Sequence, residues 1–197
     1  MHDPTGFKEW ERYFETEEQD MKKVVKFGGS SLASAEQFKK VGEIIHADPE
    51  RSFVVPSAPG KRDADDTKVT DMLYACYDLA EEGKDFKQQL KAIKDRYQEI
   101  IDGLALKISL DEEFKVIEKN FKNKAGSNYA ASRGEYLNGI IMANYLGFEF
   151  VDAAEVILFD DNGEYDAEVT NVKLRERLEK LQSAVIPGFY GAYADGT

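Results

Sequence analysis

Residues 22–31 read Lys-Lys-Val-Val-Lys-Phe-Gly-Gly-Ser-Ser, and this stretch says more about the fold than any other. A short β-rich run that carries Lys26 ends in two glycines and two serines, and residues 34–47 follow with helical periodicity. A strand, a glycine turn and a helix in this order are a common way to hold a phosphate. An ordinary turn is the alternative interpretation. The spacing matches neither the Walker A motif nor the dinucleotide fingerprint.

Composition limits the classes of function. The 197 residues, of which 42% are hydrophobic, suffice for one sizeable domain or two small ones, and no apolar run approaches the roughly 18 residues that span a bilayer. A net charge of −12 argues against a general nucleic-acid binder and repels anionic ligands. A site for an anion therefore needs local positive charge, for which the candidates are Lys26, Lys61, Arg62, Lys68 and Arg133.

The single cysteine and the first twenty residues give further expectations. Cys76 excludes an internal disulfide framework, fits a reducing, cytoplasmic compartment, and is expected to be a small buried hydrophobe. Residues 1–20 are acidic and carry aromatic residues at helical spacing. We interpret them as a leader or an appended, non-native extension; a native extension that docks its aromatic stripe is the alternative.

Helical and strand patterns alternate along the rest of the chain. The expected helices cover 34–47, 69–82, 86–121 (with a new start near Ser109), 129–145 and 172–182. The expected strands cover 24–27, 52–57, 149–151, 156–159 and, as the last one, 184–186. This alternation predicts an α/β domain with a largely parallel sheet, whose ligands sit at the carboxyl ends of strands.

Three further segments carry candidate chemistry, and each also has an ordinary interpretation. Residues 57–62 follow a strand with small residues and two bases, which also suits a solvated turn. Thr70 suits a small ligand or a helix cap. In Ser132-Arg133-Gly134-Glu135, the glycine costs a helix about 1 kcal/mol, which a close backbone approach would explain, whereas Glu135 alone suits a surface carboxylate.

Taken together, the segments resemble the aspartokinases of the amino acid kinase superfamily. The matching segments are Lys26–Ser31, Ser57–Arg62, Val69–Leu73, Ser132–Glu135 and Val185–Gly191, in the family's order and spacing from residue 21 to residue 197. Pro56 stands where a valine or similar residue is usual, and Arg133 where some members carry histidine. The resemblance implies a three-layer α/β/α sandwich with a largely parallel sheet.

The resemblance also implies a reaction and a set of roles. The reaction is transfer of the ATP γ-phosphoryl group to the side-chain carboxylate of L-aspartate, with magnesium as cofactor. Lys26 is the expected catalytic residue, and it binds phosphate together with Gly28, Gly29, Ser30 and Ser31. The residues expected to hold aspartate are Ser57, Thr70 and Glu135, and no metal ligand is expected among the candidates.

The family's Gly-Arg-Gly-Gly-Ser-Asp segment, which grips substrate and organises magnesium, is expected after Gly191 and is absent from the printed sequence. We therefore expect residues 21–197 to be the amino-terminal portion of the catalytic domain, inactive alone, and paired with itself or with a complementing chain. A substrate-binding fragment without turnover, and a kinase for another small acid, remain as alternatives.

Overall fold

The computed structural model describes residues 22–196, and residues 1–20 with their expected extension lie outside this range. A four-stranded parallel sheet has the order β1-β2-β5-β3, formed by β1 (Val24–Phe27), β2 (Phe53–Pro56), β5 (Ala184–Val185) and β3 (Glu149–Phe150). A second, two-stranded parallel sheet joins β4 (Leu158–Phe159) to β6 (Ala192–Tyr193). The sequence predicted β5 as the last strand, and this prediction is wrong because β6 follows it.

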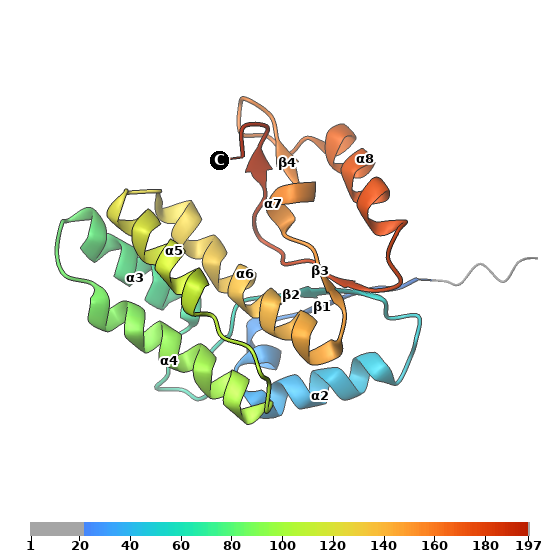
Figure 1. Ribbon diagram of the computed structural model, residues 1–197, viewed down its shortest axis with the longest axis horizontal. Helices are drawn as coiled ribbons and strands as arrows, with labels where there is room; N and C mark the ends of the chain where they lie inside the picture. Colours follow the sequence, from blue (N-terminus) through green and yellow to red (C-terminus); the bar gives the residue numbers. More distant parts are fainter. Residues whose placement is uncertain (1–21, 197) are drawn as a thin grey trace, which may run out of the picture.

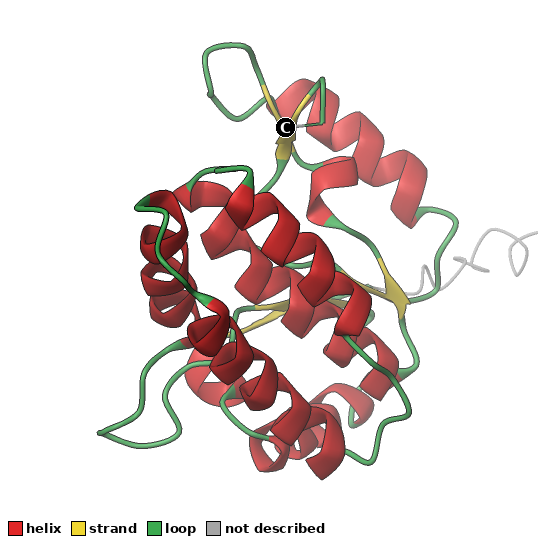
Figure 2. Ribbon diagram, turned by 60° about the vertical axis from the view of Figure 1, so that its left-hand side comes forward, coloured by secondary structure: helices red, strands yellow, loops and turns green. Residues whose placement is uncertain are grey.

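Helices cover both faces of the main sheet, as expected for a three-layer sandwich. They are α2 (Ala35–His46), α3 (Val69–Glu81), α4 (Lys87–Gly103), α5 (Asp111–Lys122), α6 (Ser127–Leu146), α7 (Ala153–Val156) and α8 (Ala167–Leu178). In Figure 1, α7 and α8 lie above the main-sheet strands β1, β2 and β3, and α2 lies below these strands. Figure 2, coloured by secondary structure, shows how helices enclose the short strands.

Two apolar clusters, one on each face of the sheet, explain this layering. Val54 and Val185 face a large cluster built by the first five helices, from α2 to α6. Phe53, Ala184 and Ile186 face a smaller cluster with α7 and the apolar side of α8. Because a central parallel strand is buried on both faces, it needs continuous apolar sequence, and Phe-Val-Val in β2 supplies it.

Local sequence signals place most of the helix ends. Ser34 caps α2, accepting from the main-chain N–H of Gln37 at 3.4 Å, and Gly147 ends α6 in the left-handed conformation at φ 69°. Residues 86–121 are not helical throughout, and the new start expected near Ser109 is confirmed. The chain leaves α4 after Gly103, with Ala105 at φ 54°, and α5 begins only at Asp111, whose N–H bonds to Ser109 Oγ.

The region after α6 departs furthest from the predicted elements. Val156 belongs to the one-turn helix α7, which Asp152 caps, so the strand expected over 156–159 shrinks to Leu158–Phe159. Residues Asp160–Gly163 form a turn, in which Gly163 N donates to Asp160 O at 2.9 Å. Helix α8 begins earlier than expected because Asp166 caps it, accepting from Val169 N. None of the helices in residues 22–196 has the length and apolar character that a membrane crossing requires.

Candidate functional site

The carboxyl ends of the parallel strands gather the predicted site segments at one edge of the sheet. Phe27 ends β1 and pairs with Pro56, which ends the neighbouring β2. Ser57 N donates to Phe27 O at 3.0 Å, so the ladder continues past Pro56 and the proline does not disturb the predicted strand. The turn after β1, the loop after β2 and the turn after β5 therefore lie together, as the sequence predicted.

Lys26 and the glycine turn form the exposed part of this edge. Lys26 is exposed on β1, and Gly29–Leu32 form a single 3-10 turn that the fully buried Leu32 anchors. Ser31 N donates to Gly28 O at 3.0 Å, so the amide of Ser31 is engaged within the turn and its hydroxyl is what it can offer a ligand. Ser30 is exposed.

The two glycines of this turn differ in their surroundings. A Cβ on Gly29 would stand 2.8 Å from the carbonyl oxygen of Ala58, and Gly60 N donates to Gly29 O at 2.8 Å. Gly29 is therefore needed for contact between the turn and the loop after β2. Gly28 has φ −76° and open space where its Cβ would be. Neither backbone conformation nor packing within residues 22–196 requires a glycine there, which leaves room for a ligand.

Glu135 is a buried carboxylate at the floor of the same edge. It lies on α6 with only 8% of its surface exposed, and its Oε1 accepts from Ala58 N at 3.1 Å. Its Oε2 is buried without a hydrogen-bond partner in the described part of the chain. Burial raises the pKa of Glu135, and the positive charge of Lys26 acts in the opposite direction. This carboxylate is thus not the surface group that the sequence alone suggested.

Thr70 lies close to the segment that carries Glu135. It is the second residue of α3, whose N-cap is Lys68 without a side-chain bond, so the capping role considered for Thr70 is wrong. A Cβ on Gly134 would meet Ala58 Cβ at 2.8 Å and Thr70 Oγ1 at 3.7 Å. The glycine in α6 therefore permits the close approach that its helical cost predicted. Gly134 O also accepts from the buried Tyr97 hydroxyl at 2.8 Å.

Ion pairs with α4 and within the loop hold the loop after β2 in place. Arg62 pairs with Asp66 and with Glu99, which turns it toward α4 and removes it from the expected phosphate-binding charges. Arg96 of α4, only 4% exposed, donates to Asp66 Oδ2 at 2.6 Å, to Gly60 O at 2.8 Å and to Ala33 O at 3.2 Å. It joins this loop to the end of the glycine turn.

Sequence reasoning missed Arg96, although a signal was present. Its position, three residues after Ile93 and directly before Tyr97, places a guanidinium on the apolar stripe of α4. An arginine on a buried stripe needs a partner, and Asp66 is that partner. Cys76, in contrast, is a buried hydrophobe as predicted: it is fully buried, and burial raises the pKa of its thiol to about 12.

Arg133 is likewise engaged by neighbouring side chains. Its guanidinium carbon lies 4.7 Å from the ring centre of Tyr129, 4.5 Å from that of Tyr136 and 5.3 Å from that of Tyr190. Such stacking attracts a cation to aromatic faces. The contact with Tyr190 ties α6 to the turn after β5, where Phe189 has φ 74° and is 70% exposed. Strained backbone with an exposed aromatic ring is typical of a ligand-binding turn.

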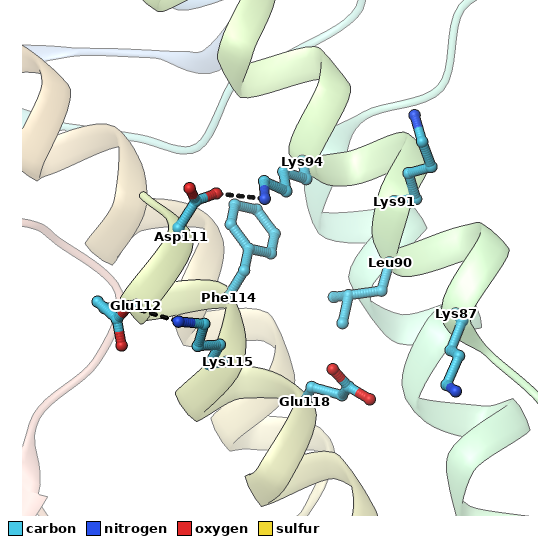
Figure 3. A pocket seen from close by; sticks show the side chains of 9 residues that line it. All are labelled: Lys87, Leu90, Lys91, Lys94, Asp111, Glu112, Phe114, Lys115 and Glu118. Carbon is cyan, nitrogen blue, oxygen red and sulfur yellow. Dashed lines mark hydrogen bonds and ion pairs between the residues drawn. The ribbon is translucent and has the colours of Figure 1, made fainter. Parts of the chain in front are cut away.

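A separate groove lies away from this edge. It has a volume of about 610 Å³ between α4 and α5 (Figure 3), over the apolar residues Leu90 and Phe114. Four lysines and three acids line it, and Lys94–Asp111 and Lys115–Glu112 form ion pairs across it and along its edge. Because these charges largely neutralise one another in solvent, the groove lacks the convergent charge of the sheet edge.

The described residues do not form a metal-binding site by themselves. Between residues 22 and 196, no three side chains of the histidine, cysteine, aspartate or glutamate type are grouped so as to hold an ion. Glu135, the buried carboxylate of the site, is bonded to a main-chain N–H. The residues described at this site alone do not fit a magnesium site.

Comparison with known proteins identifies the family of this chain. The family model of the amino acid kinase family matches residues 21–197, and the chain belongs to this family. It is 36% identical over 188 residues to aspartokinase 3 of Bacillus subtilis, an alignment that covers 88% of this chain and 41% of that protein. The chain thus spans about two fifths of the length of this curated relative.

Solved structures agree with the assignment. The aspartate kinase of Clostridium acetobutylicum is similar with a TM-score of 0.85 and 48% identity, over 88% of this chain and 40% of that one. Aspartokinase III of E. coli, in complex with aspartate and ADP, matches with a TM-score of 0.70 and 24% identity over 88% of this chain and 42% of that one. The second likeness supports the fold, and the first supports the resemblance to aspartate kinases.

Proposed function

We propose that this chain carries the amino acid site and the phosphate turn of an aspartate kinase, which transfers the ATP γ-phosphoryl group to the side-chain carboxylate of L-aspartate. One observation carries the proposal. Within the described residues, Oε2 of the buried Glu135 has no hydrogen-bond partner, and the positive charge of the exposed Lys26 acts against the raised pKa of this carboxylate. A site that pairs an acceptor for an ammonium group with a phosphate-binding cation suits an amino acid and a nucleotide.

The chemistry needs positioning more than proton transfer. A side-chain carboxylate of aspartate is ionised at neutral pH and attacks the γ-phosphorus directly. The new bond joins that carboxylate oxygen to phosphorus, the bond to the bridging oxygen of ADP breaks, and no proton moves. Lys26 would neutralise charge that develops between donor and acceptor, with donors from Gly28, Gly29, Ser30 and Ser31.

The amino acid would be held by the loop after β2 and by two helices. Glu135 would accept from the substrate ammonium group through Oε2, and the hydroxyls of Ser57 and Thr70 would bond its carboxylates. Both hydroxyl residues are half-buried and lie beside Ala58 and Gly134, where the backbones approach closely. The charge-assisted pair with Glu135 supplies the stronger contact.

The proposal includes partners and location. We infer association with a second copy or a complementing chain, supported by the edge strand β1, in which Val24 is 67% exposed. A free, buried Cys76 supports a reducing, cytoplasmic location. ATP with magnesium is the proposed phosphoryl donor. The second candidate function is aspartate binding without turnover.

Calorimetry on the chain tests this proposal. L-Aspartate should bind more tightly than succinate, which has both carboxylates and lacks the ammonium group. Lys26→Ala should weaken ATP binding at least tenfold, whereas Lys39→Ala, which removes an exposed lysine of α2, should not. Equal affinity for L-aspartate and succinate, or no binding of either at millimolar concentration, would refute the proposed amino acid site. Turnover, measured as hydroxamate formed from the acyl phosphate, separates the two candidate functions.

A further inference from the structure

Asn138 occupies a position in α6 that no candidate motif includes. It lies one helical turn after Glu135 on the same side of the helix and is fully buried. Its Nδ2 donates to Ser57 O at 2.6 Å. Its Oδ1 is buried and lacks a hydrogen-bond partner within the described range. An apolar side chain would be buried here at a lower cost, so the retained amide points to a role for the donor.

Asn138 and Glu135 hold opposite sides of one peptide unit. The carbonyl of Ser57 and the N–H of Ala58 belong to the same planar group. Asn138 donates to that carbonyl at 2.6 Å, and Glu135 Oε1 accepts from that N–H at 3.1 Å. Two side chains on a rigid helix therefore fix both the position and the rotation of the peptide unit. We call Asn138, Glu135 and the Ser57–Ala58 peptide the peptide clamp.

We propose that Asn138 is a positioning residue for the amino acid site. This inference rests on the proposed function for the identity of the ligand, and on geometry for the clamp itself. The peptide clamp sets the distance between the side chain of Ser57 and the open oxygen of Glu135. A ligand that contacts both groups, as an amino acid does with its carboxylate and its ammonium group, requires that distance to be fixed before it binds.

The peptide clamp also reaches the glycine turn. A Cβ on Gly29 would stand 2.8 Å from Ala58 O, and Gly60 N donates to Gly29 O at 2.8 Å. A shift of the Ser57–Ala58 peptide therefore displaces the turn after β1 through direct backbone contact. Loss of Asn138 would thus disturb the proposed phosphate site as well as the amino acid site.

The experiment compares Asn138→Leu with Asn144→Leu in the isotope-labelled 197-residue chain. Leucine has the branched shape of asparagine at a larger volume and removes the donor, and Asn138→Ala removes the donor without added volume. Asn144 is an exposed residue of the same helix whose amide bonds Ile140 O within that helix, so it is a matched control. Asn138→Leu should shift the Ser57 carbonyl and Ala58 amide resonances and weaken L-aspartate binding about tenfold, as expected for one lost hydrogen bond. Asn144→Leu should do neither.

The outcomes separate the clamp from the proposed function. Wild-type affinity for L-aspartate in a folded Asn138→Leu chain would overturn the positioning role. If the wild-type chain binds no aspartate, the proposed function fails, and unmoved Ser57 and Ala58 resonances in the variant would overturn the clamp separately. If Asn138→Leu does not fold, Asn138→Ala provides the same two measurements. A purely structural role would lower the melting temperature while leaving the affinity of the remaining folded chain intact.

Discussion

The loop between β2 and α3 meets two buried charged side chains, Arg96 and Glu135, and their surroundings differ. Arg96 donates to a carboxylate and to two carbonyls, so only its Nε lacks a partner in the described residues. Glu135 accepts one main-chain hydrogen bond at Oε1 and leaves Oε2 buried and open. Both side chains are less than one-tenth exposed.

The difference separates a group that holds the loop from a group that we propose binds a ligand. Hydrogen bonds from Arg62, and then from Arg96, hold the pKa of Asp66 well below its ordinary value, which means that the folded state favours this charge. Burial raises the pKa of Glu135, which means that the folded state without ligand disfavours the negative charge of Glu135. An uncompensated buried charge is costly, and a bound ammonium group would offset the cost.

The largest expected effect comes from breaking the matched charge. Asp66→Asn leaves Arg96 buried without its counter-ion and should lower the free energy of unfolding by about 3 kcal/mol. Chemical denaturation measures this change. The control is Asp95→Asn, which breaks the exposed pair of Lys91 and Asp95 and should cost less than about 1 kcal/mol. Equal losses in the two variants would contradict the anchoring role of Arg96.

A smaller effect is expected from the glycine contact between the two charges. Gly29→Ala places a Cβ 2.8 Å from Ala58 O and should cost about 2 kcal/mol through overpacking. Gly28→Ala meets open space and should change stability by less than about 0.5 kcal/mol. For ATP affinity per folded molecule we expect the reverse order. Gly28→Ala should weaken ATP binding more than Gly29→Ala does, because a methyl group on Gly28 enters the proposed phosphate site. Thermal melts paired with ATP titrations check both orders.

Neutralising the unmatched charge should stabilise the chain. Glu135→Gln keeps an oxygen for Ala58 N and removes a charge that burial disfavours, so the free energy of unfolding should rise by about 1 kcal/mol. L-Aspartate binding should fall in the same variant, because the ammonium group loses its counter-ion. A variant that is both less stable and fully able to bind would contradict the distinction between the two charges.

The smallest expected effect is the pH dependence of that stabilisation. The folded state of the wild-type chain holds the Glu135 proton more tightly than the unfolded state, so its stability falls as pH rises from the ordinary value of 4.5 through the raised pKa. The advantage of Glu135→Gln should therefore be small near pH 4 and reach a plateau at higher pH. Asp66 acts oppositely, since its contribution is lost as pH falls below its ordinary value of 3.8. Melts from pH 4 to pH 8 measure the first effect.

Sequence patterns predicted the sheet, most helices and the meeting of the site segments, because apolar periodicity and caps are local. They did not predict the β4–β6 pair, whose two-residue strands are set by contacts distant in the chain. The same limit applies to the site. The sequence favours Arg62 as a ligand group, whereas in the structure Asp66 and Glu99 hold it. Asn138 has no local signal because its partner is a main-chain carbonyl.

The strand order has a consequence for how the protein is made. β5 comes last of the four strands of the main sheet in the chain, yet it lies between β2 and β3. Among the described residues, β5 is the partner of β3 and the second partner of β2, so both pairings wait until Val185 has left the ribosome. Late closure over a long segment is generally slow, and strand edges that stay open in the meantime favour aggregation.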